Sequence, residues 1–66
     1  MQIFVDGQPK EVPDGASVAQ VLDLLDEPVN SILVEVNGAY VRRSDYPSRT
    51  LRAGDHLEVI LPAHGG

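Results

Sequence analysis

The chain has 66 residues, which fits a single domain close to the smallest size that sustains a hydrophobic core unaided. With 42% hydrophobic and 23% charged residues its composition is that of a folded protein, and the lack of cysteine excludes disulfides, thiolate metal sites and cysteine nucleophiles. A net charge of −5 argues against a nucleic-acid partner, because such binding requires lysine and arginine to neutralise phosphates.

The N-terminal segment predicts a β-hairpin. Residues 2–6 alternate between the two sides of a strand, and Phe4 faces away from the side expected to be buried. Asp6-Gly7 is a turn dipeptide, so we expect residues 10–12 to return as a short antiparallel strand.

One amphipathic helix follows. Ser17 with Gln20 three residues later is typical of a capping box, so the helix should begin at about Val18. Its apolar side chains recur at the offsets of a single helical face: Val18, Val21, Leu22 and Leu25. Pro28 is expected to end the helix, because proline lacks an amide donor and disfavours helical geometry in the residue before it.

A second hairpin is predicted after the helix. Residues 32–36 are β-branched and apolar, and Leu33 faces outward in their alternation. Asn37-Gly38 favours a type I′ turn, which needs positive φ at both central residues, so residues 40–42 should pair back.

The remainder predicts an irregular connection, a last strand and a tail. Residues 44–53 lack a sustained period, and residues 56–61 alternate with Ile60 on the outer side. The inner side of that strand would carry Leu57, Val59 and Leu61. We therefore divide the chain into a folded body, 1–61, and a flexible C-terminal tail, 62–66, ending in Gly-Gly.

The order strand-strand-helix-strand-strand-strand indicates an α+β fold. A single helix would cover one face of a small mixed sheet of four to five strands, which is the β-grasp or ubiquitin-like arrangement. The right-handed crossover rule places the strand after the helix parallel to a member of the first hairpin. The order of the strands across the sheet stays open at this point.

No catalytic or metal-binding pattern is visible in the sequence. Asp23 with Asp26, and Asp55 with Glu58, are short-range pairs that we interpret as solvent-facing, and His56 as a surface residue. We expect a protein that is not an enzyme, with no metal and no bound cofactor.

Three apolar side chains point away from the face that the helix should cover: Phe4, Leu33 and Ile60. On neighbouring strands they would form an exposed apolar patch, the kind of surface that binds a partner protein. Isolated exposed apolar residues are equally ordinary, so both interpretations stay open.

The basic residues are gathered in one part of the chain. Residues 42–52 contain four of the five, with Asp45 as the only acid, which gives +3 there and leaves −8 elsewhere. The segment is either a solvated connection that balances an acidic body or a docking patch.

The sequence carries no sign of export or membrane insertion. No apolar run reaches the roughly 18 residues of a membrane span, and no basic segment followed by an apolar stretch opens the chain. We expect a cytoplasmic protein with no membrane partner.

The chain ends in two glycines, Gly65 and Gly66. The five residues of the tail span at most about 17 Å when extended, enough to carry a carboxylate away from a small body. Without Cβ atoms, glycines can pass through a narrow channel and approach an enzyme site closely. An expression scar is the alternative interpretation.

Several short motifs stand in a fixed order along nearly the whole chain. They are MQIFVDG at 1–7, SVAQVL at 17–22, VNG at 36–38, RS at 43–44, Leu51, GD at 54–55, EV at 58–59 and the terminal Gly-Gly. In this order they resemble the ThiS/MoaD superfamily of sulfur carriers, and most closely its thiamine-pathway members. The ending LPAHGG at 61–66 is closer to the molybdopterin and cysteine-forming carriers.

The resemblance implies a β-grasp fold with a reactive C-terminus. In that superfamily an E1-like adenylyltransferase of the ThiF/MoeB type uses ATP to adenylate the terminal carboxylate, here that of Gly66, and sulfur then replaces AMP to give a thiocarboxylate. Gly65 and His64 would lie in the tail that threads into the partner. The implied sulfur donor is an enzyme such as a cysteine desulfurase, and the acceptor is thiazole synthase or another sulfur-accepting enzyme.

Three other functions stay open from the sequence. The chain could serve a MoaD-like or cysteine-forming pathway, act as a protein modifier that Gly66 joins to lysines, or be a plain protein-interaction domain with an incidental ending.

Overall fold

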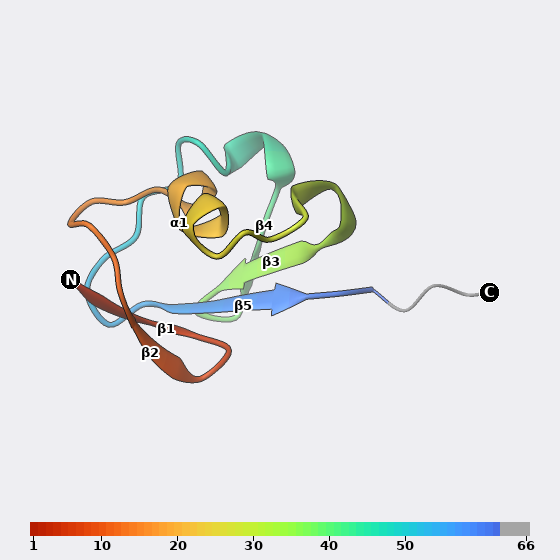
Figure 1. Cartoon of the computed structure of the whole chain (residues 1–66). Coiled ribbons are helices and arrows are strands. Elements are labelled where there is room, and N and C mark those ends of the chain that lie inside the picture. Colours follow the sequence, from red (N-terminus) through yellow and green to blue (C-terminus); the bar gives the residue numbers. More distant parts are fainter. Residues whose placement is uncertain (63–66) are drawn as a thin grey trace.

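Within residues 1–62, which the computed structural model describes, five strands form one mixed sheet with a helix on one of its faces (Figure 1). The strands are β1 (Gln2–Val5), β2 (Gln8–Glu11), β3 (Leu33–Val36), β4 (Ala39–Val41) and β5 (His56–Ile60). The helix is α1 (Val18–Leu24), and two short 3-10 helices are η1 (Val29–Ser31) and η2 (Arg43–Asp45). The predicted β-grasp fold is confirmed, with element ends that differ by up to a few residues.

The last strand lies in the middle of the sheet. The order across the sheet is β2-β1-β5-β3-β4, and β5 runs parallel to β1 and antiparallel to β3. The two hairpins therefore flank β5. The strand after the helix, β3, has the direction of β2 but lies beside neither strand of the first hairpin, because β5 occupies the place next to β1.

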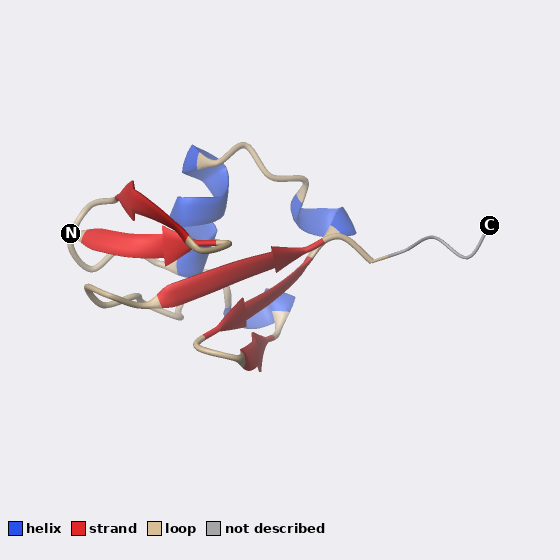
Figure 2. Cartoon of the chain, turned by 90° about the horizontal axis from the view of Figure 1, so that it is seen from below, coloured by secondary structure: helices blue, strands red, loops and turns tan. Residues whose placement is uncertain are grey.

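The core lies between α1 and the sheet, and the opposite face of the sheet is uncovered, as Figure 2 shows from below. The buried apolar side chains are Ile3, Val12, Ala16, Val18, Val21, Leu22, Ile32, Val34, Val36, Val41, Tyr46, Leu51 and Leu57. Val59 packs against this core, as predicted. The prediction that Leu61 faces inward is wrong: it is 67% exposed, because β5 ends at Ile60 and the chain has then passed the edge of the core.

The capping box at the start of α1 is confirmed. The Ser17 hydroxyl accepts the N–H of Gln20 at 3.1 Å, and the N–H of Ser17 donates to the Gln20 side chain at 2.8 Å. These two reciprocal bonds satisfy amide groups that would otherwise have no partner at a helix start.

The helix ends earlier than predicted and for another reason. It stops at Leu24, before Pro28 is reached, because Asp26 takes the left-handed conformation with a φ of 57°. The N–H groups of Asp26 and Glu27 then donate back to carbonyls of the last turns at 3.1 Å each. This is a Schellman ending, with aspartate where glycine is more usual.

The connection between β4 and β5 is irregular, as predicted, but it is closely bound to the helix. The N–H groups of Val18 and Ala19 donate to the carbonyls of Arg49 and Tyr46 at 2.8 and 3.0 Å. Tyr46 and Leu51 from the same connection are buried in the core. The burial of these two side chains determines the path of the connection. Sequence patterns could not predict it, because the segment has no periodic spacing of apolar residues.

Candidate functional site

The candidate site is the C-terminal segment, and the body holds the strand that leads to it. β5 lies between β1 and β3 and continues into Leu61 and Pro62, both exposed. Figure 1 shows β5 pointing out of the body on the side where the described chain ends. The predicted site residues His64, Gly65 and Gly66 lie outside the described residues, so their roles in threading and covalent attachment stay predictions.

Asp6, the first turn residue of the β1-β2 hairpin, fastens β5 on one side. Its φ of 49°, followed by 82° at Gly7, fits a type I′ turn. Its N–H donates to the carbonyl of Leu57 at 2.9 Å, and its carboxylate accepts the N–H of Val59 at 3.0 Å. β1 ends at Val5, and the Asp6 carboxylate then provides β5 with the hydrogen-bond acceptor that a longer β1 would have provided.

Asn37, the first turn residue of the β3-β4 hairpin, fastens the start of β5 from the other side. It too has a positive φ, of 52°. Its N–H donates to the carbonyl of His56 at 2.7 Å, and its side-chain oxygen accepts the N–H of His56 at 2.9 Å. Its amide nitrogen donates to Asp55 at 3.0 Å, which links the turn to the connection before β5.

The carboxylate of Asp55 completes this link. It also accepts the backbone N–H of Arg52 at 2.8 Å. Burial raises the pKa of Asp55, but the hydrogen bonds from Asn37 and Arg52 and the charges of Arg49 and Arg52 outweigh burial and lower the pKa below its usual 3.8. Asp55, expected to face solvent, is half-buried and accepts two hydrogen bonds, whereas Glu58 is exposed as expected.

Sequence patterns did not predict these fastening roles. The dipeptides Asp6-Gly7 and Asn37-Gly38 indicated turns, and nothing in them indicates which strand the side chains reach. The available signal was that both turns begin with a short polar side chain able to accept a hydrogen bond and to tolerate positive φ.

Two cross-strand pairs lie on the open face, toward opposite ends of β5, one apolar and one aromatic. Leu33 and Ile60 are direct cross-strand partners, and Leu33 is 41% exposed. Phe4 lies beside His56, with their rings stacked at a centroid distance of 4.7 Å and 14° from parallel.

Two carboxylates stand between these pairs. Glu35 and Glu58 are direct partners across β3 and β5, an arrangement in which like charges repel. The three predicted partner-binding residues therefore do not form one continuous patch: Leu33 and Ile60 are neighbours, and Phe4 lies apart from them. Their role in binding a partner stays a prediction.

Two kinds of site are not found in the described part of the chain. No group of three or more His, Cys, Asp or Glu side chains there could hold a metal ion. No helix there is long and apolar enough to cross a membrane.

Comparison with known proteins adds to this geometry. The profile of the ThiS family matches residues 2–66. The chain belongs to the ThiS family. ThiS-family proteins are sulfur carriers of the ThiS/MoaD superfamily, so the resemblance noted from the motifs is confirmed.

Two solved structures of ThiS-type proteins are similar over the whole chain. The crystal structure of the thiamine biosynthesis protein ThiS from Geobacter metallireducens has 28% sequence identity, a TM-score of 0.89 and complete coverage of both chains. The solution NMR structure of a thiamine biosynthesis protein from Geobacter metallireducens has 28% identity and a TM-score of 0.79, covering all of this chain and 88% of that one. No curated protein matched the chain.

Proposed function

We propose that this ThiS-family protein carries sulfur for thiamine biosynthesis by presenting its C-terminal carboxylate to partner enzymes. The family match through residue 66 is the observation that carries the proposal. Two features support it: β5 is fastened from both sides and continues into an exposed segment, and similar solved proteins are named thiamine biosynthesis proteins.

The proposed chemistry activates an unreactive group. A carboxylate is a poor electrophile, so an E1-like enzyme transfers AMP from ATP to the Gly66 carboxylate and releases pyrophosphate. A sulfide equivalent attacks the acyl carbon, the bond to AMP breaks, and the C-terminus becomes a thiocarboxylate. A cysteine desulfurase would supply the sulfur as a persulfide, a thiol reductant would provide the two electrons that bring it to the level of sulfide, and thiazole synthase would accept it from the thiocarboxylate.

In this proposal the chain presents the acyl group and catalyses no step. ATP is bound by the E1-like partner, and the chain needs no cofactor of its own. Glycine at 65 and 66 suits a narrow enzyme channel because it lacks a Cβ atom. Working in the cytoplasm, the protein would meet its partners through the open face, where Leu33 and Ile60 offer apolar contacts and the Phe4-His56 pair offers aromatic ones.

Mass spectrometry of the intact chain tests the proposal directly. The chain is co-produced with an E1-like adenylyltransferase and a cysteine desulfurase and compared with a variant that lacks Gly66. The full chain should gain the mass difference between sulfur and oxygen, and the variant should keep its own mass with an unchanged circular dichroism spectrum. A full chain of unchanged mass that nonetheless restores growth would contradict the thiocarboxylate step.

Growth on defined medium tests the pathway. A strain without the gene should require thiamine, and the full chain, but not the variant without Gly66, should remove that requirement. A requirement for cysteine or for a molybdenum-cofactor product instead would assign the carrier to a related pathway. Gly-Gly remnants on lysines of other proteins would support the protein-modifier alternative.

A further inference from the structure

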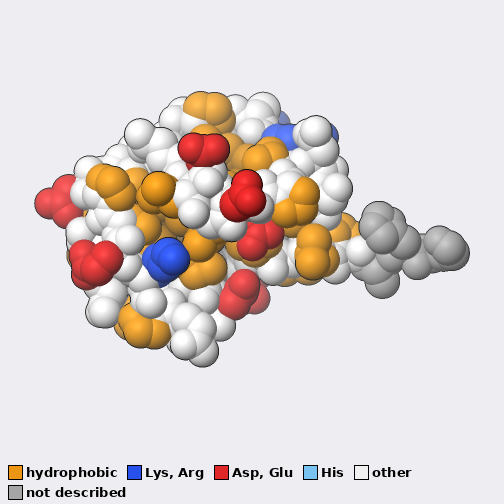
Figure 3. All heavy atoms as spheres, in the orientation of Figure 1, with side chains coloured by type: hydrophobic (Ala, Val, Ile, Leu, Met, Phe, Trp, Pro, Cys, Tyr) orange, Lys and Arg blue, Asp and Glu red, His pale blue; other side chains and the backbone are white. Residues whose placement is uncertain are grey.

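Among residues 1–62 no arginine of the segment 42–52 forms a salt bridge, although the charges of Arg49 and Arg52 act on Asp55 at longer range. The salt bridges recorded among residues 1–62 both involve the amine of Met1, and none involves an arginine. Figure 3 shows acidic side chains spread over the face drawn there with a basic side chain among them, and further basic side chains at its upper right edge. The +3 charge of this segment is therefore open to a partner.

These arginines lie around β4, which is an edge strand. β4 pairs only with β3 on one side, in the register Val36 with Ala39 and Val34 with Val41. Because these two pairs flank Tyr40 in a two-residue hairpin, the N–H and C=O of Tyr40 point away from β3. The Tyr40 side chain is 62% exposed.

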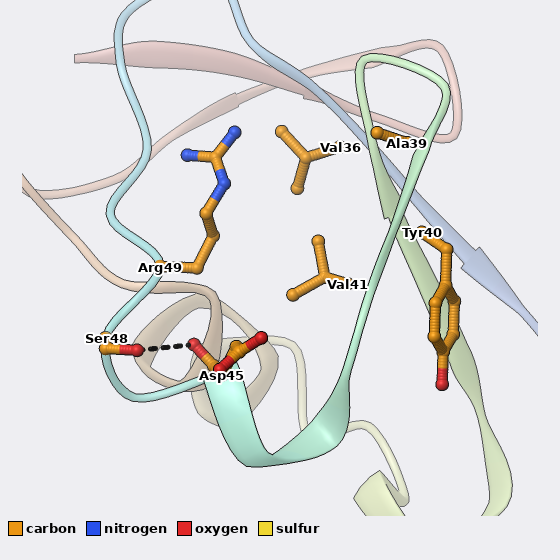
Figure 4. Close-up of a pocket in the computed structure, with 7 residues that line it drawn as sticks. All are labelled: Val36, Ala39, Tyr40, Val41, Asp45, Ser48 and Arg49. Atoms are coloured by element: carbon orange, nitrogen blue, oxygen red, sulfur yellow. Dashed lines mark hydrogen bonds between the residues drawn. The ribbon is translucent and has the colours of Figure 1, made fainter.

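A hollow of about 260 Å³ lies on the helix side of β4. Val36 and Val41 line its apolar wall, and Arg49, which is half-buried, borders it. Figure 4 shows the Arg49 guanidinium near Val36 and the carboxylate of Asp45 at the opposite end. A carboxylate of a bound partner therefore fits only the end of the hollow near Val36. There the aliphatic part of the partner's side chain would lie on Val36 and Val41.

A second hollow, of about 330 Å³, adjoins β4 on its other side. Leu33, Tyr40 and Arg43 are among the residues that line it. The Arg43 side chain donates to the side-chain oxygen of Asn30 at 2.6 Å, which orients the guanidinium without neutralising its charge. Tyr40 thus borders both hollows, and each hollow has one arginine.

We propose that this β4 edge, formed by Ala39, Tyr40 and Val41 with Arg43 and Arg49 beside it, binds an extended acidic segment of a partner protein. The backbone of that segment pairs with Tyr40. Because successive side chains of a strand point to opposite faces, neighbouring carboxylates reach Arg49 on one face and Arg43 on the other. The proposal does not depend on the chemistry of Gly66.

Charge decides between the possible occupants. The −8 carried by the rest of the chain would repel a polyphosphate that extends beyond the patch, and the net −5 of each molecule opposes approach of a second copy. The carboxylates of a short acidic protein segment can pair with Arg43 and Arg49, and such a segment contacts little of the acidic body.

Peptide titration followed by NMR tests the proposal on the full chain. The probe is a seven-residue peptide with two adjacent glutamates at its centre and threonine at the other positions, acetylated and amidated at its ends, and the comparison peptide has lysine in place of both glutamates. The glutamate peptide should shift the amide signals of Ala39, Tyr40, Val41, Arg43 and Arg49 at low salt, and the lysine peptide should not. Shifts centred on the open face or on β2 would overturn the proposal.

Charge-reversal variants provide the matched comparison. Arg43→Glu and Arg49→Glu should each weaken binding of the glutamate peptide about tenfold, while Lys10→Glu, an equal change of charge on the opposite edge strand, should leave it within about twofold. Because Arg43 is exposed, its variant keeps the test valid even if Arg49→Glu lowers stability. Equal weakening by Lys10→Glu, or self-association through β4 without peptide, would overturn the proposal.

Discussion

Asp6, Asn37 and Asp55 show how single polar residues determine the position of β5. Asp6 and Asn37 accept positive φ in tight turns, and their side chains then bond to the strand between the hairpins. Asp55 receives the remaining donor of Asn37 and so joins the second turn to the connection. Asp6 and Asn37 each contribute a turn and a contact with β5.

At the residue scale, the lowered pKa of Asp55 predicts a specific loss of stability in acid. A group whose pKa is lower in the folded state stabilises the fold above its unfolded pKa, and this contribution disappears as the pH falls through the folded value. We expect Asp55→Asn to be less stable than the native chain at pH 7, and the difference to shrink as the pH falls below 3.8.

Urea unfolding of both proteins between pH 7 and pH 2 measures this difference. Asp23→Asn is the matched control, because Asp23 is exposed and no side-chain hydrogen bond or salt bridge of Asp23 is recorded among residues 1–62, so its variant should follow the native curve closely. A difference between Asp55→Asn and the native chain that stays constant down to pH 2 would show that the charge of Asp55 contributes nothing.

At the element scale, β5 depends on contacts with both hairpins rather than on its own length of five residues. Its parallel register with β1 pairs only Phe4 with His56 and Val5 with Leu57. Beyond that point, on the β1 side, the Asp6 carboxylate takes over as acceptor for Val59. A partner enzyme would thus receive the C-terminal segment from a strand that is held close to its end.

Replacing Asp6 by glycine should loosen β5 locally. Glycine keeps the positive φ of the turn but removes the acceptor for the Val59 N–H, so hydrogen exchange of that amide should quicken about tenfold, the equivalent of one modest hydrogen bond. Amide exchange followed by NMR measures the effect.

The control for this change is Asp26→Gly. Asp26 also has a positive φ, and no side-chain hydrogen bond of Asp26 is recorded in the described structure, so glycine there should leave Val59 exchange unchanged and relieve backbone strain at the helix end. Equal acceleration in both variants would assign the effect to the backbone instead of the Asp6 carboxylate.

At the scale of the whole molecule, the small core gives the fold only a modest free energy of unfolding. A chain of 66 residues has a free energy of unfolding of roughly 3–10 kcal/mol. Leu57 is fully buried in the central strand. Replacing it by alanine should lower the free energy of unfolding by about 2–5 kcal/mol, enough to unfold a large part of the population.

Leu24→Ala is the matched control for that substitution. Leu24 is 59% exposed, so its variant should stay within about 0.5 kcal/mol of the native chain in urea unfolding. A loss at Leu57 no larger than that at Leu24 would contradict the central place of β5 in the core.

The periodic elements were predictable from local patterns. The capping box at Ser17, both hairpin turns and the inward positions of the strands follow from hydrogen bonds and steric preferences within a few residues. The candidate site followed from motifs and from the terminal glycines, which need no fold to be recognised. The helix end was misplaced because Pro28 gave the stronger local signal, whereas Asp26 ended the helix through its backbone conformation.

By itself the sequence determined the five strands, the single helix and the family, because apolar periodicity, turn dipeptides and short motifs are local properties of the chain. Only the tertiary structure decided that β5 lies between the two hairpins, that Asp6 and Asn37 fasten it, and that Phe4 lies apart from Leu33 and Ile60. These features depend on pairing between strands far apart in the sequence, and many registers of such pairing satisfy the same local pattern.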